Sequence, residues 1–313
     1  MEKCGEYVGK CATVWIYGDI FEVYKGSPQV TDTQIEKFMQ QFEEYAVFYG
    51  SKAEYYKSRL KLGVMYQDVE MAAEAAEGLL SCKISGCYLC AMGLVLQYYL
   101  LVEDYDALET LYEQMRTRTI PAKYQWSYKQ CLYAEEKNLV MAMLVSALDF
   151  GRMDFFYKFL EKNKACFQNI DEKEELYVSE YVFMVCIGEW NHVKKAIKDA
   201  EETEEDLLNF HVTVEDGISN CLFWYVYFTM LHQSGRKEVE IQLKGEEAPV
   251  AECGKMPPLE VARYFEKMAE TMGRKMEQSR EKFHYDRAKA SYDELINYYG
   301  KKLGAREENE GEL

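Results

Sequence analysis

Apolar residues recur every three to four positions along most of the chain, a spacing typical of amphipathic α-helices that bury one face. The pattern predicts helices over residues 31–49, 52–66, 69–82, 86–102, 105–118, 121–137, 138–150, 153–167, 172–187, 190–204 and 212–233. Pro121 stands just inside the start of its helix, where a missing amide donor costs nothing. Gly151 and Gly188 follow helices, where a residue with positive φ is often required. We therefore expect helices joined by short turns.

A short junction recurs between these helices. It consists of a small or polar residue, any residue and an apolar or aromatic residue, with a further apolar residue three positions later. It is found at Gly18-Asp19-Ile20, Gln67-Asp68-Val69, Glu103-Asp104-Tyr105, Gly151-Arg152-Met153 and Gly188-Glu189-Trp190. Gly235-Arg236-Lys237 lies in the same register, with Lys237 and Glu240 at its two apolar positions. Alternate junctions lie 84 or 85 residues apart. A fixed interval of this kind indicates stacked structural repeats.

Two segments depart from the helical pattern. Residues 12–24 carry enough β-branched and aromatic side chains to form either a helix pair or a β-hairpin, and the repeat interval favours the helix pair. Between 236 and 258, apolar and polar residues alternate and glycines and prolines follow, which predicts a loop or short strand. A helical apolar stripe then begins at Leu259. The predicted organisation is a repeat domain at 1–235, an insertion at 236–258, one or two capping helices at 259–303 and an acidic, disordered tail at 304–313.

The junctions resemble those of the tetratricopeptide repeat family. The similarity is strongest at Gln67-Asp68-Val69 with Ala72, at Glu103-Asp104-Tyr105 with Leu108, and at Gly188-Glu189-Trp190 with Val193. The chain departs from the family where a small residue is expected inside the first helix and Leu60, Leu96, Leu144, Tyr181 and Phe228 stand instead. The resemblance covers about residues 1–235. It implies an all-α fold: an α-α superhelix, a solenoid of helix hairpins, with a C-terminal capping region.

In that family the first helix of each hairpin lines a concave groove that binds a peptide. When the family's groove positions are placed on this sequence by aligning the junctions, the resemblance implies these groove residues: Glu54, Lys57, Lys61, Gln97, Asn138, Glu175, Tyr225, Thr229 and His232. Polar residues inside otherwise apolar helices suit contact with a ligand, because stacking leaves one face of each hairpin in solvent. Solvated positions with no ligand are the alternative.

Charge narrows the classes of partner. The chain has 313 residues, with 37 Lys and Arg against 54 Asp and Glu, and a formal net charge of −17. Such a balance disfavours nucleic acid and anionic membrane surfaces and favours a basic protein or peptide. The longest near-apolar run, 87–102, is too short to span a bilayer, and the start lacks the pattern of a secretory signal. Most of the ten cysteines occur singly on apolar faces, so we expect a cytoplasmic protein. The sequence sets no oligomeric state.

Motifs of catalysis are missing from the sequence. The four histidines are isolated, and HExxH, GxSxG, GxxxxGK[ST] and GxGxxG patterns do not occur. We therefore expect no catalytic residue, no metal and no cofactor. The leading hypothesis is a non-enzymatic scaffold or regulator whose acidic groove binds a protein or peptide, one version being an inhibitor of a basic partner.

One cysteine cluster supports an alternative. Cys82, Cys87 and Cys90 lie close together in the sequence, and the last two form a CxxC motif. A structural zinc site requires four ligands, and a redox CxxC usually follows a strand, so neither pattern is complete. Helix packing, metal binding and reversible oxidation all stay open here. The alternative function is a metal- or thiol-dependent protein organised around these three residues.

Overall fold

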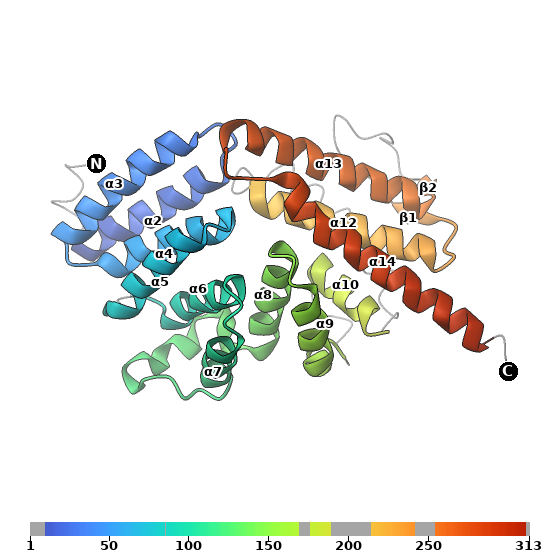
Figure 1. Cartoon of the computed structure of the whole chain (residues 1–313), viewed down its shortest axis with the longest axis horizontal. Coiled ribbons are helices and arrows are strands. Elements are labelled where there is room, and N and C mark those ends of the chain that lie inside the picture. Colours follow the sequence, from blue (N-terminus) through green and yellow to red (C-terminus); the bar gives the residue numbers. More distant parts are fainter. Residues whose placement is uncertain (1–9, 85, 169–175, 189–213, 242–253, 311–313) are drawn as a thin grey trace. The chain divides into compact units, whose positions relative to one another are not determined.

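The computed structural model describes residues 10–84, 86–168, 176–188, 214–241 and 254–310 (Figure 1). The chain forms two compact units. The first contains residues 1–150 and 278–283, and the second contains residues 151–277 and 284–313. The predicted helix at 190–204 lies outside the described residues. Within them the protein is all-α apart from one short strand pair, as predicted.

The first unit consists of helix hairpins. Its elements are α2 (Lys10–Gly26), α3 (Asp32–Phe48), α4 (Lys52–Tyr66), α5 (Val69–Ser81), α6 (Tyr88–Leu101), α7 (Tyr105–Arg116), the 3-10 helices η1 (Ala122–Lys129) and η2 (Leu132–Ala134), and α8 (Glu136–Asp149). Neighbouring helices pack as the pairs α2–α3, α4–α5 and α6–α7. Alternate helices also pack on one another, α2 on α4, α4 on α6 and α6 on α8. This arrangement is that of a helical repeat.

Five of the predicted junctions contain a residue with a left-handed backbone, and at two of them a capping aspartate follows. Gln67 and Glu103 have φ values of 52° and 61°, and Gly151, Gly188 and Gly235 have values of 68°, 93° and 81°. The side chain of Asp68 accepts a hydrogen bond from the amide of Met71, and that of Asp104 accepts one from the amide of Ala107, both at 3.1 Å. Each aspartate therefore satisfies an amide in the first turn of the next helix. At five of the six predicted junctions a left-handed residue therefore follows the end of a helix.

The first predicted junction was wrong. α2 runs without interruption through Gly18, so residues 12–24 form neither a helix pair nor a β-hairpin. Val14, Tyr17 and Phe21 are buried at helical spacing against α3 and α4, and this burial outweighs the cost of about 1 kcal/mol for a glycine inside a helix. Val23, the supposed apolar position of the junction, is 54% exposed.

The predicted helix at 121–137 was also wrong. The segment forms η1 and η2, and α8 begins only at Glu136. Its side chains hold it against the start of α6: the ring of Tyr124 stacks on Tyr88 at 4.3 Å, and the buried Ser127 Oγ accepts the amide of Tyr88 at 3.2 Å. Tertiary packing therefore decides the conformation here.

The second unit is built around α12. Its elements are α9 (Met153–Lys162), the 3-10 helix η3 (Lys164–Phe167), α10 (Val178–Cys186), α12 (Val214–Gln233), β1 (Val239–Ile241), β2 (Gly254–Met256), α13 (Pro258–Ser279) and α14 (Tyr285–Glu310). α10 and α14 both pack on α12, and Trp224 and Phe228 stack on Phe265 of α13. The antiparallel pair β1–β2 gives the predicted insertion its short strand. α14 continues to Glu310, so most of the segment predicted as a disordered tail is helical.

Residues 278–283, from the last turn of α13 into its connection to α14, belong to the first unit. Arg280 is fully buried there and donates to the carbonyl oxygen of Tyr24, at the end of α2. Its Nη1 lies 3.9 Å from Oδ1 of Asp32, and the amide of Glu281 donates to Oδ2 of Asp32 at 2.8 Å. This guanidinium therefore holds the α2–α3 connection and satisfies carbonyls that the end of a helix leaves unpaired.

Candidate functional site

Three of the predicted groove residues lie on α4. Lys57 Nζ donates to Glu54 Oε2 at 2.8 Å, and Lys61 pairs with Glu22 of α2. Burial raises the pKa of Glu22, but the charges of Lys25 and Lys61 outweigh it and bring the pKa below its ordinary value. Lys61 therefore ties α4 to α2, and its ammonium already has a partner.

Glu54 is nearly buried, and one of its oxygens is unpaired. Oε1 has no hydrogen-bond partner among the described residues, whereas Oε2 accepts from Lys57. A Cβ built on Gly86 would lie 3.0 Å from Oε1 and 3.9 Å from Lys57 Nζ. Gly86 thus brings the segment before α6 against this pair, and Cys87 follows it directly. The structure therefore places two predicted groove residues near the start of α6.

The other predicted positions of the first unit are Gln97 on α6 and Asn138 on α8. Gln97 is half-buried. Asn138 Nδ2 donates to the carbonyl oxygen of Leu132 at 3.0 Å, so it fastens η2 to α8. Glu175 lies outside the described residues.

The remaining predicted positions lie on α12, in the second unit. The Tyr225 hydroxyl donates to Asp293 Oδ1 of α14 at 3.0 Å, and Thr229 donates to the carbonyl oxygen of Tyr225 at 2.7 Å. His232 is exposed near the end of the helix. Burial, and next the charge of Asp293, raise the pKa of Tyr225 to about 12. At Tyr225 the predicted groove face of α12 is therefore occupied by α14.

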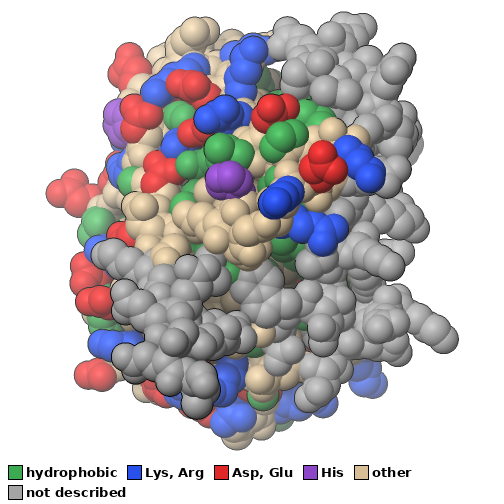
Figure 2. Space-filling view, turned by 90° about the vertical axis from the view of Figure 1, so that its right-hand side faces the viewer, with side chains coloured by type: hydrophobic (Ala, Val, Ile, Leu, Met, Phe, Trp, Pro, Cys, Tyr) green, Lys and Arg blue, Asp and Glu red, His purple; other side chains and the backbone are tan. Residues whose placement is uncertain are grey.

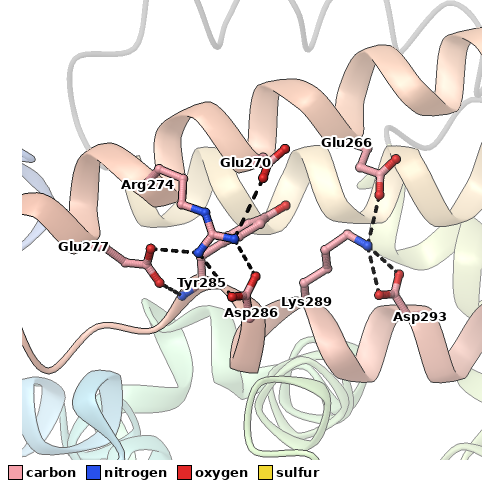
Figure 3. A network of polar contacts seen from close by, with 8 residues as sticks. All are labelled: Glu266, Glu270, Arg274, Glu277, Tyr285, Asp286, Lys289 and Asp293. Atoms are coloured by element: carbon pink, nitrogen blue, oxygen red, sulfur yellow. Dashed lines mark hydrogen bonds and ion pairs between the residues drawn. The ribbon is translucent and has the colours of Figure 1, made fainter.

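A polar network holds α14 against α13 (Figure 3). Lys289 lies between Glu266 and Asp293, at 3.0 and 2.8 Å, and Arg274 contacts Asp286 at 2.6 Å. The set also includes Glu270, Glu277 and Tyr285. These contacts run in antiparallel register from one helix to the other, so their role is to fix the helix pair. Acidic and basic side chains are also interspersed over the described part of the face in Figure 2, so no field of one sign covers it.

The three thiols that converge are Cys87, Cys90 and Cys131, not the predicted Cys82, Cys87 and Cys90. Their sulfur atoms all lie within 4.8 Å of one another, and those of Cys90 and Cys131 are 3.5 Å apart. Cys82 instead ends α5, outside this cluster. We call Cys87, Cys90 and Cys131 the thiol cluster. The CxxC motif indicated two of its members, but no local pattern links Cys131 to them across 41 residues.

The three sulfurs differ in their hydrogen bonds and in the direction in which their pKa is shifted. Cys87 is the N-cap of α6, and its Sγ accepts the amide of Cys90 at 3.3 Å. A hydrogen bond from the Cys90 thiol, opposed by burial and aided by backbone amides, lowers the pKa of Cys87 to about 5. The same hydrogen bond and burial raise the pKa of Cys90, and burial raises the pKa of Cys131. The arrangement therefore favours the thiolate form at Cys87 over Cys90 and Cys131, and such a set is suited to metal binding or thiol chemistry.

None of the helices in the described part of the chain combines the length and apolarity that a bilayer span requires. Comparisons with protein-family models, curated proteins and solved structures found no match to this chain.

Proposed function

We propose that this chain is a non-enzymatic scaffold or regulator, similar to tetratricopeptide repeat proteins, that binds a basic segment of another protein along α4 and α6. The packing of alternate helices in the first unit supports this proposal, since stacked hairpins leave one face of each first helix free for a ligand. The net charge of −17 favours a basic ligand. An inhibitor that neutralises a basic partner is one form of this function.

The observation that carries the proposal is the buried Glu54 Oε1, which accepts no hydrogen bond from the described residues. A buried carboxylate oxygen without a donor is costly, on the order of 1–3 kcal/mol, and proteins generally satisfy such atoms. A lysine, an arginine or a backbone amide of a bound segment would supply the missing donor. Gly86 packs closely against this carboxylate, and Oε1 stays buried without a donor from the described residues. Glu54 is thus suited to anchor a basic residue of the ligand.

Selection from a random peptide library on the immobilised full chain tests this proposal. We expect enrichment of peptides with lysine or arginine, and binding of an enriched peptide to weaken about tenfold in Glu54→Gln, since a hydrogen bond to a charged group contributes roughly 1.5–3 kcal/mol. Glu74→Gln, an exposed position on α5, serves as the control and should leave affinity unchanged. Enriched peptides without basic residues, or equal affinities for both variants, would contradict the proposal.

A further inference from the structure

The thiol cluster adjoins the proposed peptide site at the start of α6 but consists of other residues, and it has the geometry of a metal site. Around one ion with metal–sulfur bonds of about 2.3 Å, sulfur atoms lie roughly 3.8–4.0 Å apart. The distance of 3.5 Å between the sulfurs of Cys90 and Cys131, and the limit of 4.8 Å for all three pairs, bracket this value. Three sulfurs therefore already surround a common point.

A disulfide fits the arrangement less well. The S–S bond is about 2.05 Å long, so Cys90 and Cys131 would have to approach by about 1.5 Å, and the sulfur of Cys87 would be left outside the bond. Binding of an ion uses all three sulfurs and requires little displacement.

The protein builds this arrangement from two segments that other contacts fix in place. Cys87 and Cys90 lie in the first turn of α6, and Cys131 lies between η1 and η2. The amide of Cys131 donates to the carbonyl oxygen of the buried Ser127 at 3.1 Å, and the amide of Tyr88 donates to Ser127 Oγ. One buried serine thus holds both segments, which makes the position of the third sulfur part of the fold.

Packing beside the cluster adds a second support. A Cβ on Gly93 of α6 would lie 2.6 Å from the ring of Tyr133, so the glycine lets η2 approach α6 closely. The three cysteines are half-buried and free of disulfides, so an ion has access from solvent. The amide of Cys90, at the start of the helix, donates to Cys87 Sγ and also favours negative charge there.

The ligand set indicates which ion is bound. Among the described residues, no histidine, aspartate or glutamate joins the three sulfurs within 4.8 Å. Thiolates select soft ions such as Cu⁺ and Zn²⁺ over Mg²⁺ or Ca²⁺. Cu⁺ is satisfied by three thiolates, whereas Zn²⁺ requires a fourth ligand from water or a partner. We propose that Cys87, Cys90 and Cys131 bind one thiophilic d¹⁰ metal ion as thiolates. Binding releases the protons of those thiols that are still protonated.

Metal titration of the reduced, chelator-treated full chain tests this proposal. One arm uses Zn²⁺ in competition with a chromogenic chelator, and the other uses Cu⁺ under anaerobic conditions. Cys131→Ser removes one ligand, and Cys82→Ser is the matched control, since Cys82 lies outside the cluster. We expect one equivalent of Zn²⁺ or Cu⁺ to bind to wild type and to Cys82→Ser, and affinity to fall roughly 100-fold in Cys131→Ser.

A second readout uses only the wild-type chain and so does not depend on the folding of a variant. The bound ion should protect Cys87, Cys90 and Cys131 from alkylation, as mapped by mass spectrometry, and leave Cys82 reactive. Three results would overturn the proposal: no stoichiometric binding of either ion, equal affinity in Cys131→Ser and Cys82→Ser, or no selective protection of the three thiols. The arm that binds identifies the ion.

Discussion

Arg280 provides the sharpest test of how the first unit is held together. Its side chain is fully buried, donates to Tyr24 O at the end of α2, and lies 3.9 Å from the carboxylate of Asp32. In Arg280→Met the side-chain length is kept, but the guanidinium is lost. The carbonyl oxygen then lacks its donor, and Asp32 lacks its nearest buried cation.

The expected loss is about 3 kcal/mol of the free energy of unfolding. Removing one partner of a buried ion pair typically costs about 3–5 kcal/mol. The lower limit applies for two reasons. Asp32 keeps its contacts with the Tyr66 hydroxyl and the amide of Glu281. Among the described residues, Arg280 Nε has no hydrogen-bond partner whose loss would add to the cost. For a unit of this size, about 3 kcal/mol lowers the melting temperature by roughly 6–12 °C.

Calorimetry together with hydrogen exchange of the amides in α2 measures this loss. The control is Lys282→Met in the same segment, which breaks a half-exposed pair with Asp68 and should cost less than about 1 kcal/mol. Equal melting temperatures for the two variants, with unchanged exchange in α2, would refute the assignment of Arg280 as the principal contact of this segment.

Three further outcomes follow from the structure. Gly63→Ala should destabilise the chain in urea unfolding, because its Cβ would lie 2.8 Å from the backbone nitrogen of Ala72. Gly18→Ala, with open space around the new Cβ, should instead stabilise the chain by about 1 kcal/mol. A stabilised Gly63→Ala would contradict the close packing of α4 and α5. The folded pKa of Glu22 lies below its unfolded value, so Glu22 stabilises the fold above the unfolded pKa, and this stabilisation is lost as pH falls through the folded pKa. Glu22→Gln should therefore make the melting temperature fall less steeply on acidification. An unchanged dependence of the melting temperature on pH would count against the ion pair with Lys61. Finally, the metal ion that binds should raise the free energy of unfolding of wild type by about 2.7 kcal/mol at a free concentration of about 100 times its Kd. The increase should be far smaller for Cys131→Ser. Equal increases in both proteins would contradict the proposed metal site.

Local sequence predicted the junctions well because their geometry is local. A left-handed residue and a capping aspartate act on amides within four residues, as at Gln67 and Asp68. The apolar positions after the true junctions, such as Ala72 and Phe156, are fully buried. Helix hairpins and their order therefore followed from the pattern of residues.

The errors arose where distant contacts decide the structure. Gly18 looked like a turn residue, but the aromatic core of α2 and α3 keeps it helical. Cys131 is one of the cysteines that occur singly in the sequence, and its approach to Cys90 depends on the 3-10 segment that Ser127 holds against α6. Tyr225 was expected in a groove, yet α14 returns from later in the chain to contact it. Such contacts leave no periodic signal.

Hydrogen exchange with and without a bound peptide tests the central proposal most directly. The measurement uses the full chain and a lysine- or arginine-rich peptide selected on it, and it compares amide protection along every described helix. The proposed function predicts new protection concentrated on α4 and at the start of α6, around Glu54 and Gly86, and its loss in Glu54→Gln. Protection confined to the second unit, or identical in Glu54→Gln, would contradict it.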